Sequence, residues 1–213
     1  MLLALDTCLD ACSVAVCADE RVLAAGSEAM RRGHQERLAV MVEATMARAG
    51  VAFPALDRIG VTIGPGSFTG LRVGLAFAKG LGLALDRPVV GVGVLEALAR
   101  DAGDGFIAAV IDARRDQVYL QAFYGGRALM APDALPLETA AARLAELRSG
   151  GPAALVGPGA ALLAGVLPHA AVIARPAPDP VVVALLASRA APPFPPPRPL
   201  YLRAPDARLA AAP

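Results

Sequence analysis

Short runs rich in Val, Leu and Ala open the chain, and apolar residues recur every three or four positions in the longer segments that follow. Short apolar runs of this kind predict strands, and the period of three to four predicts helices. Gly50, after the first helical segment, is typical of a left-handed helix end. For the first half we expect strands at 2–7, 12–18 and 21–28, then helix 35–49, strand 58–63, helix 68–85, strand 88–92 and helix 94–101.

The second half of the chain repeats this order. We expect strands at 106–111, 117–124 and 127–130, helix 137–149, strand 153–156, a short helix 159–166, strand 170–174 and helix 180–190. The first turns also correspond, because the opening strand of each half ends in an Asp and a second Asp follows four residues later: Asp6 and Asp10, Asp112 and Asp116. The pattern predicts a duplicated α/β domain with two βββαβαβα halves, at 1–101 and 102–191, before a proline-rich extended tail at 192–213.

This duplicated order resembles the actin-like ATPase superfamily, also called the ASKHA or RNase H-like fold. In that superfamily, acids and glycine turns at these places flank a nucleotide in a central cleft. The resemblance implies a vestigial nucleotide site at Asp6, Thr7, Asp10, Asp112, Gly157 and Gly159. Taken alone, an Asp that ends a strand commonly serves as a turn former, so both interpretations stay open.

Composition limits the class of protein. The 213 residues are 56% apolar with a formal net charge of +1, which argues against a stand-alone nucleic-acid binder. The mean hydropathy is +0.53, but prolines and glycines divide the longest uncharged run, 152–174, into pieces too short to span a bilayer. The N-terminus lacks a basic leader, so we expect a soluble cytoplasmic protein without a membrane segment. The three cysteines, Cys8, Cys12 and Cys17, have no paired spacing and are expected to be free thiols.

The stretch IGVTIGPGSFTGLRVGLAFAKGLGLAL, 59–85, places a glycine-rich turn between a strand and a helix. Its spacing fits neither a P-loop, nor a dinucleotide fingerprint, nor a nucleophile elbow. The helix is apolar almost all round, and Gly66, Gly70, Gly74, Ala78 and Gly82 lie four apart on one side. Small residues at this spacing allow another backbone to come close, either the chain's own sheet or a partner.

Six segments together resemble the TsaB (YeaZ) family over nearly the whole chain: LALDTCLDACSVAV, RRGHQERL, GPGSFTGLRVG, GVGVLEALA, IDARRDQVYL and YLRAP. The resemblance implies a non-catalytic dimerisation or scaffold subunit of the bacterial complex that forms threonylcarbamoyladenosine in tRNA. Its partner TsaD would transfer the threonylcarbamoyl group to the adenosine beside the anticodon of tRNAs that read codons starting with A. The resemblance further implies the ATPase TsaE as a partner, tRNA bound through the complex, and a homodimer when the chain is alone. ATP or ADP and a metal are expected in the partner subunits, and no cofactor on this chain.

Two aspects of the resemblance can be read residue by residue. Val94 and Leu98 stand where TsaD carries the two His of its metal motif, and neither can bind a metal, so no catalytic residue is expected. His34, among Arg31, Arg32 and Arg37, suits a cap or an interface hydrogen bond better than a general base. The first two helices are implied to form the partner interface, through His34, Leu38, Met41, Val42, Met46, Gly70, Val73, Gly74, Phe77, Ala78 and Leu81. The alternative function is a free-standing actin-like ATPase or kinase that uses an Asp6/Asp112 cleft.

Overall fold

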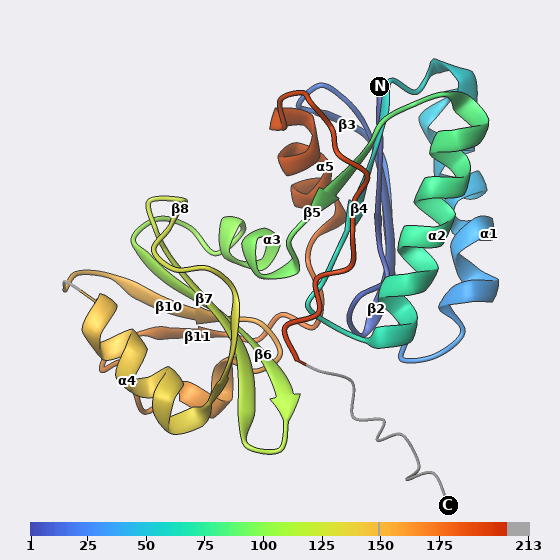
Figure 1. Cartoon of the computed structure of the whole chain (residues 1–213). Helices are drawn as coiled ribbons and strands as arrows, with labels where there is room; N and C mark the ends of the chain where they lie inside the picture. The colour runs from blue at the N-terminus through green and yellow to red at the C-terminus, as the bar shows by residue number, and fades with distance from the viewer. Residues whose placement is uncertain (149, 204–213) are drawn as a thin grey trace, which may run out of the picture.

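The computed structural model describes residues 1–148 and 150–203, which form two α/β halves side by side (Figure 1). The first sheet has the order β3-β2-β1-β4-β5. The hairpin partners β1 and β2 are antiparallel, with Leu5 opposite Val14, and β4 runs parallel to β1, with Ile59 beside Leu3. The strands are β1 (Leu2–Asp6), β2 (Ala11–Ala18), β3 (Arg21–Ala29), β4 (Arg58–Thr62) and β5 (Val89–Val92).

The second sheet repeats this topology. Its order is β11-β10-β6-β7-β8, with β9 also paired to β7, so β7-β6-β10-β11 corresponds to β2-β1-β4-β5. The third strand differs from the prediction, because the segment after β7 splits into two short strands that pair with opposite ends of β7. The strands are β6 (Phe106–Arg114), β7 (Gln117–Tyr124), β8 (Arg127–Ala128), β9 (Asp133–Pro136), β10 (Ala153–Val156) and β11 (Ala171–Ile173).

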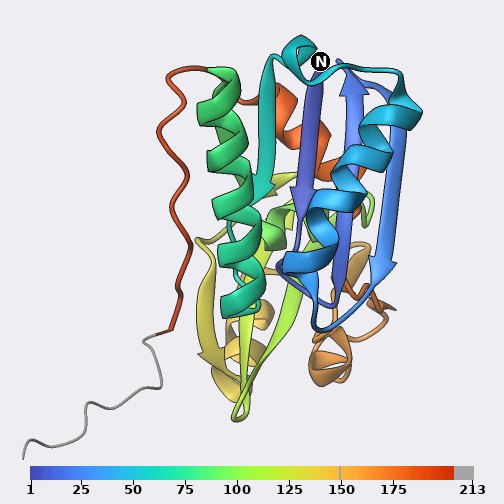
Figure 2. The same cartoon turned by 90° about the vertical axis from the view of Figure 1, so that its right-hand side faces the viewer.

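The helices cover both faces of the first sheet. Helices α1 (His34–Ala49) and α2 (Phe68–Leu85) lie on one face (Figure 2), and α5 (Pro180–Arg189) lies on the other against β1, β2 and β4. Helix α3 (Val94–Arg100) packs on β6, and α4 (Leu137–Leu147) packs on β7. Two short 3-10 turns complete the described structure, Phe53–Ala55 and Ala160–Leu163.

The predicted division at residue 101 does not follow the packing. Helix α5, assigned to the second half, covers the first sheet, where Val183, Ala184 and Ala187 are buried with Ala4. Helix α3, assigned to the first half, packs on the second sheet. The two halves therefore exchange one helix each, because each sheet needs apolar cover on its second face. A side chain at Gly60 would come within 2.7 Å of the Ala187 Cβ, which shows how closely α5 lies on β4.

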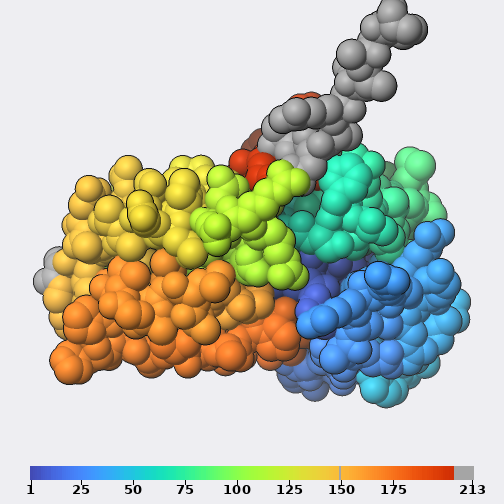
Figure 3. Space-filling model, turned by 90° about the horizontal axis from the view of Figure 1, so that it is seen from below, coloured from blue at the N-terminus to red at the C-terminus, as the bar shows by residue number. Residues whose placement is uncertain are grey.

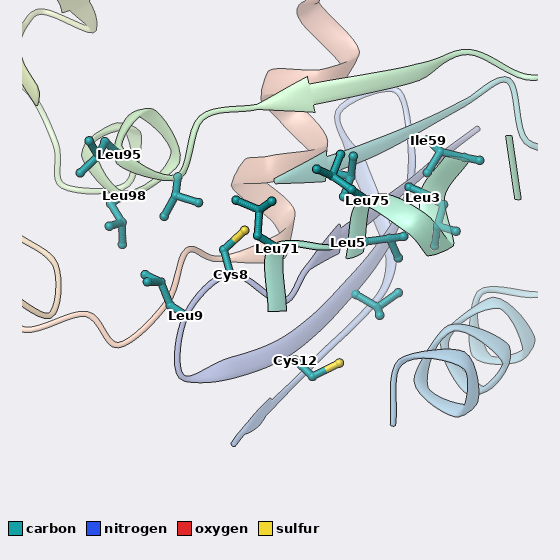
Figure 4. Close-up of a cluster of buried hydrophobic side chains, with 14 of the residues drawn as sticks. Leu3, Leu5, Cys8, Leu9, Cys12, Ile59, Leu71, Leu75, Leu95 and Leu98 are labelled. Carbon is teal, nitrogen blue, oxygen red and sulfur yellow. The ribbon is translucent and has the colours of Figure 1, made fainter. Parts of the chain in front are cut away.

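The largest apolar cluster joins α2 to the first sheet and extends to α3. Figure 4 shows Leu71 and Leu75 of α2 near Leu3 and Leu5 of β1, and all four side chains are buried. The three cysteines are buried and free, as predicted. Burial raises the pKa of the Cys12 thiol to about 11 and that of Cys8 further still, so both remain neutral thiols at physiological pH.

Helix α2 is long and apolar enough, by length and composition alone, to span a membrane. In the structure one side of this helix packs on β4 within the fold. The tail after α5 runs beside α2 (Figure 2), and its Leu200 N–H donates to the carbonyl oxygen of Ile63 at 2.8 Å. Ser149, the predicted end of helix 137–149, and 204–213 of the predicted tail lie outside the described residues.

Candidate functional site

The small-residue stripe of α2 faces the chain's own β1–β2 turn. A side chain at Gly66 would collide with the carbonyl oxygen of Cys8, one at Gly70 would collide with that of Thr7, and a Cβ at Gly74 would lie 2.6 Å from the Thr7 Oγ1. The Thr7 hydroxyl donates to the Gly70 carbonyl oxygen at 2.7 Å. The predicted partner contacts of Gly70, Gly74 and Ala78 are therefore corrected: these residues are buried in the fold, where their small size lets α2 approach the sheet.

The predicted interface residues of α1 also belong to the core. The side chains of Leu38, Val42 and Met46 are at most 2% exposed, and Met41 and His34 are 7% exposed. Their helical spacing reflects packing on the sheet. His34 begins α1, and its Nε2 has no hydrogen-bond partner among the described residues. Val73, Phe77 and Leu81 on α2 are half-buried and lie at the edge of the exposed face.

The opposite side of α2 is exposed and mostly apolar, although Thr69, Arg72 and Lys79 are also exposed on this helix. Leu83 is 86% exposed and Phe68 51%, and Ala76 and Gly80 between them are also exposed. A Cβ at Gly80 would meet no atom of the described residues within 4 Å. Val40 of α1 is 51% exposed on the neighbouring helix. We name the exposed and half-buried residues Val40, Phe68, Val73, Ala76, Phe77, Gly80 and Leu83 the α1–α2 face.

A groove of about 530 Å³ runs along this face between the two helices. Its walls are Gln35 and Leu38 of α1 and Phe68, Thr69, Arg72, Val73, Ala76 and Phe77 of α2, so it is largely apolar with Arg72 as its one charged side chain among the described residues. An exposed apolar patch with a groove is typical of a protein-binding surface. The sequence pattern missed the exposed members because α2 is apolar on nearly every side, so its periodicity did not separate the covered side from the exposed one.

The acid at the end of β1 is not open to a ligand. Asp6 is 0% exposed, and its Oδ1 accepts hydrogen bonds from the Thr62 Oγ1 at 2.6 Å and from the Cys8 N–H at 3.1 Å. Burial raises the pKa of this carboxyl to about 6, against the lowering effect of those two hydrogen bonds. Asp6 thus fixes the first turn of the chain, which matches the turn-former interpretation.

The other acids of the predicted nucleotide site lie at a shallow cavity between the halves. This cavity, about 280 Å³, is lined by Asp10 and Asp112 but not by Asp6. Asp10 accepts from the Arg31 Nε at 3.0 Å, and Asp112 accepts from the N–H of Arg114 at 2.7 Å and from its Nη1 at 3.1 Å. Both carboxylates therefore pair with exposed arginines of the chain.

The glycine turn after β10 closes on the end of β6. A side chain at Gly157 would collide with the Val110 carbonyl oxygen, and one at Gly159 would come within 2.7 Å of the Asp112 N. The structure thus brings Asp112, Gly157 and Gly159 together, but it keeps Asp6 and Thr7 beneath the β1–β2 turn. Within 1–148 and 150–203, no group of three or more His, Cys, Asp or Glu side chains is placed to hold a metal ion. Val94 and Leu98 are fully buried in α3.

Comparison with known proteins identifies similar chains. A family described as tRNA N6-adenosine threonylcarbamoyltransferase, TsaD, matches residues 27–136. The tRNA threonylcarbamoyladenosine biosynthesis protein TsaB of Escherichia coli is 38% identical over 122 residues, 55% of this chain and 52% of that protein. An uncharacterized Mycobacterium bovis protein, Mb3455c, is 36% identical over 97% of this chain and 93% of its own length. The chain spans about half the length of the curated TsaB relatives that it matches first.

Solved structures agree with these matches. YeaZ from Pseudomonas aeruginosa superimposes with a TM-score of 0.76 at 36% identity, over 87% of this chain and 89% of the other. Component A of the (R)-2-hydroxyglutaryl-CoA dehydratase of Acidaminococcus fermentans superimposes with a TM-score of 0.53 at 11% identity, over 88% and 97%. The second likeness concerns the fold alone. The predicted class, a duplicated actin-like α/β fold, is confirmed.

Proposed function

Because the chain belongs to the TsaB (YeaZ) family, we propose that it works in tRNA threonylcarbamoyladenosine biosynthesis as a scaffold that binds and activates a TsaD subunit. TsaD would carry out the transfer to the adenosine beside the anticodon, and this chain would take no chemical part in it. The observation that carries the proposal is the α1–α2 face, an exposed and largely apolar surface with a groove of about 530 Å³.

The occupant that we propose for this face is the homologous pair of helices on TsaD. The segment that matches the TsaD family, 27–136, contains both α1 and α2, so a TsaD chain is expected to present an equivalent pair. Two equivalent helix pairs can pack around an approximate two-fold axis, since self-complementary patches favour such an arrangement. Gly80 has no side chain and Ala76 a small one, so at the centre of the face they would allow the helices of the partner to approach closely. Without TsaD, the same face would pair with a second copy of this chain.

The geometry gives less support to the alternative of a free-standing ATPase or kinase. That activity would need acids open to a metal and phosphates, whereas Asp6 is fully buried and the Asp112 carboxylate accepts two hydrogen bonds from Arg114. We assign ATP or ADP and the metal to the partner subunits TsaD and TsaE, and place the complex in the cytoplasm with its tRNA.

The experiment that tests the proposed function mixes the purified chain with TsaD and TsaE from the same genome. Light scattering would measure complex formation, and incorporation of labelled threonine into tRNA would measure modification. We expect a mixed complex that modifies tRNA only when this chain is present. ATP hydrolysis or sugar phosphorylation by the chain alone, together with full tRNA modification by the partners without it, would favour the alternative.

A further inference from the structure

A second and larger cavity opens between the two halves, on the side where the described tail ends. Its volume is about 660 Å³, and the described residues that line it include four arginines and no acid: Arg72, Arg114, Arg115 and Arg203. Figure 3 shows the three segments that meet here, the β6–β7 turn in lime, the start of α2 in teal and the tail in red. Arg114 also pairs with Asp112 at 3.1 Å, but no acid is among the described residues that line the cavity itself, so its lining carries an excess of positive charge.

Two aromatic rings stand beside these charges. The rings of Phe68 and Tyr201 have centroids 5.6 Å apart with an interplanar angle of 30°. The Arg72 guanidinium lies 3.6 Å from the Phe68 ring centroid, and its Nε donates to the Tyr201 hydroxyl at 3.0 Å. Phe68 is 51% and Tyr201 47% exposed. Half-exposed rings that hold an arginine in place offer a flat surface on which a nucleobase can stack.

The opposite wall is a turn with an unusual backbone. Residues 114–116 all have positive φ, 63° for Arg114, 54° for Arg115 and 56° for Asp116, although none is glycine. The left-handed conformation is unfavourable for such residues, and it is retained where the surroundings or a function require it. Here it holds Arg114, whose side chain is 84% exposed, at the mouth of the cavity.

The position of the charges favours a strand over a single nucleotide. A mononucleotide site would need a deep phosphate cradle, and a side chain at Gly66, Gly157 or Gly159 would meet the chain's own backbone, so these turns are already filled. The arginines instead come from three separate segments around an open rim. Arginines along a rim together with stacking rings are typical of proteins that bind single-stranded nucleic acid.

We propose that this cleft binds a single-stranded segment of RNA, with phosphates against Arg72, Arg114 and Arg115 and a base stacked on Tyr201. The inference rests on the proposed function, in which tRNA is the substrate of the complex, and it adds a direct contact between this chain and the RNA.

The test measures fluorescence anisotropy of a labelled single-stranded oligoribonucleotide titrated with the full chain at about 50 mM salt, where phosphate contacts are strong. The double variant Arg114→Gln/Arg115→Gln should weaken binding about tenfold and reduce the slope of log affinity against log salt by about 1.4, the value for two lost phosphate contacts. Tyr201→Ala should weaken binding roughly tenfold or more through lost stacking, whereas Tyr201→Phe keeps the ring and most of the affinity. The charge-matched control is Arg127→Gln/Arg143→Gln, which lies on other elements of the second half.

The inference would be overturned if the oligoribonucleotide showed no saturable binding, or if the control variant lost as much RNA affinity as the Arg114→Gln/Arg115→Gln variant. It would also be overturned if the chain bound the same RNA equally well in a duplex, or if ATP displaced the oligoribonucleotide with an affinity as high as that of the oligoribonucleotide itself. Association with TsaD, measured on the same proteins, separates the two proposals. If Arg114→Gln/Arg115→Gln still binds TsaD and binds RNA normally, the RNA site fails alone. If the wild-type chain does not bind TsaD but the Arg114→Gln/Arg115→Gln variant loses affinity for RNA, the scaffold proposal fails alone.

Discussion

Thr7 and Gly70 are joined by a hydrogen bond of 2.7 Å from the threonine hydroxyl to the glycine carbonyl oxygen. This bond links the β1–β2 turn to the first turn of α2 and places the glycine stripe of the helix against the sheet. The exposed side of α2 is thereby fixed as the side opposite Gly70 and Gly74, and the orientation of the α1–α2 face follows from this contact.

The two sides of α2 should respond oppositely to one added methyl group. Gly74→Ala brings a Cβ within 2.6 Å of the Thr7 Oγ1 and should lower the free energy of unfolding by about 1–3 kcal/mol. Gly80→Ala meets no atom of the described chain within 4 Å and should raise it by roughly 0.5–1 kcal/mol, because alanine is the better helix former. Urea unfolding of both variants measures the difference. Equal effects at the two positions would contradict the assigned orientation of the helix.

The buried carboxyl of Asp6 should make stability depend on pH. Its pKa is about 6 in the folded protein and 3.8 ordinarily, so folding takes up a proton between these values. The folded state therefore loses stability as pH rises from about 4 to 6. The loss is on the order of 3 kcal/mol and persists above pH 6.

Asp6→Asn removes this titration while keeping an oxygen that accepts from Thr62. The free energy of unfolding of the variant minus that of the wild type should therefore increase between pH 4 and pH 7, whatever the constant cost of the new amide. Chemical denaturation across this pH range provides the measurement. A difference that stays constant with pH would show that Asp6 keeps an ordinary pKa.

Arg58 ties the end of α5 to β4. Its Nη1 lies 3.1, 3.1 and 3.2 Å from the carbonyl oxygens of Ala187, Ser188 and Ala190, and its guanidinium lies 4.9 Å from the Phe194 ring centroid. Arg58→Ala should lower the free energy of unfolding by about 1–2 kcal/mol, since several carbonyls lose a charged donor. Arg21→Ala, on the exposed end of β3, is the control and should change stability little. A loss at Arg58 no larger than the control would mean that the helix end does not depend on it.

Much of this fold could be predicted because its periodic signals are local. The bounds of α2 and β7 agree with the expectation, and the repeated Asp turns correctly indicated duplication. Two features depended on tertiary contacts instead. The apolar pattern of α5 does not indicate which sheet the helix covers, so the sequence places it with the second half although it packs on the first sheet. The periodicity of α1 identified Leu38 and Met46 correctly as apolar positions, but periodicity alone does not separate a core face from a partner face.

One candidate site could be located from the sequence and the other could not. The α1–α2 face lies on the two helices that the sequence indicates, although most of the predicted interface residues are buried in the core. Arg72, Arg114 and Tyr201 are far apart in the sequence, and only the tertiary packing of α2, the β6–β7 turn and the tail brings them to one cavity. Spacing along the chain carries no signal for such a site.

The most direct test of the scaffold proposal is the affinity of the chain for TsaD after Ala76→Glu, measured by light scattering and titration calorimetry. Ala76 is exposed at the centre of the α1–α2 face, so a carboxylate there should leave folding intact and weaken the complex at least tenfold, because a charge would be buried unpaired. Leu162→Glu, at an exposed apolar residue of the second half, is the matched control and should bind TsaD as the wild type does. Wild-type affinity in the folded Ala76→Glu protein would contradict the proposal that this face holds the partner.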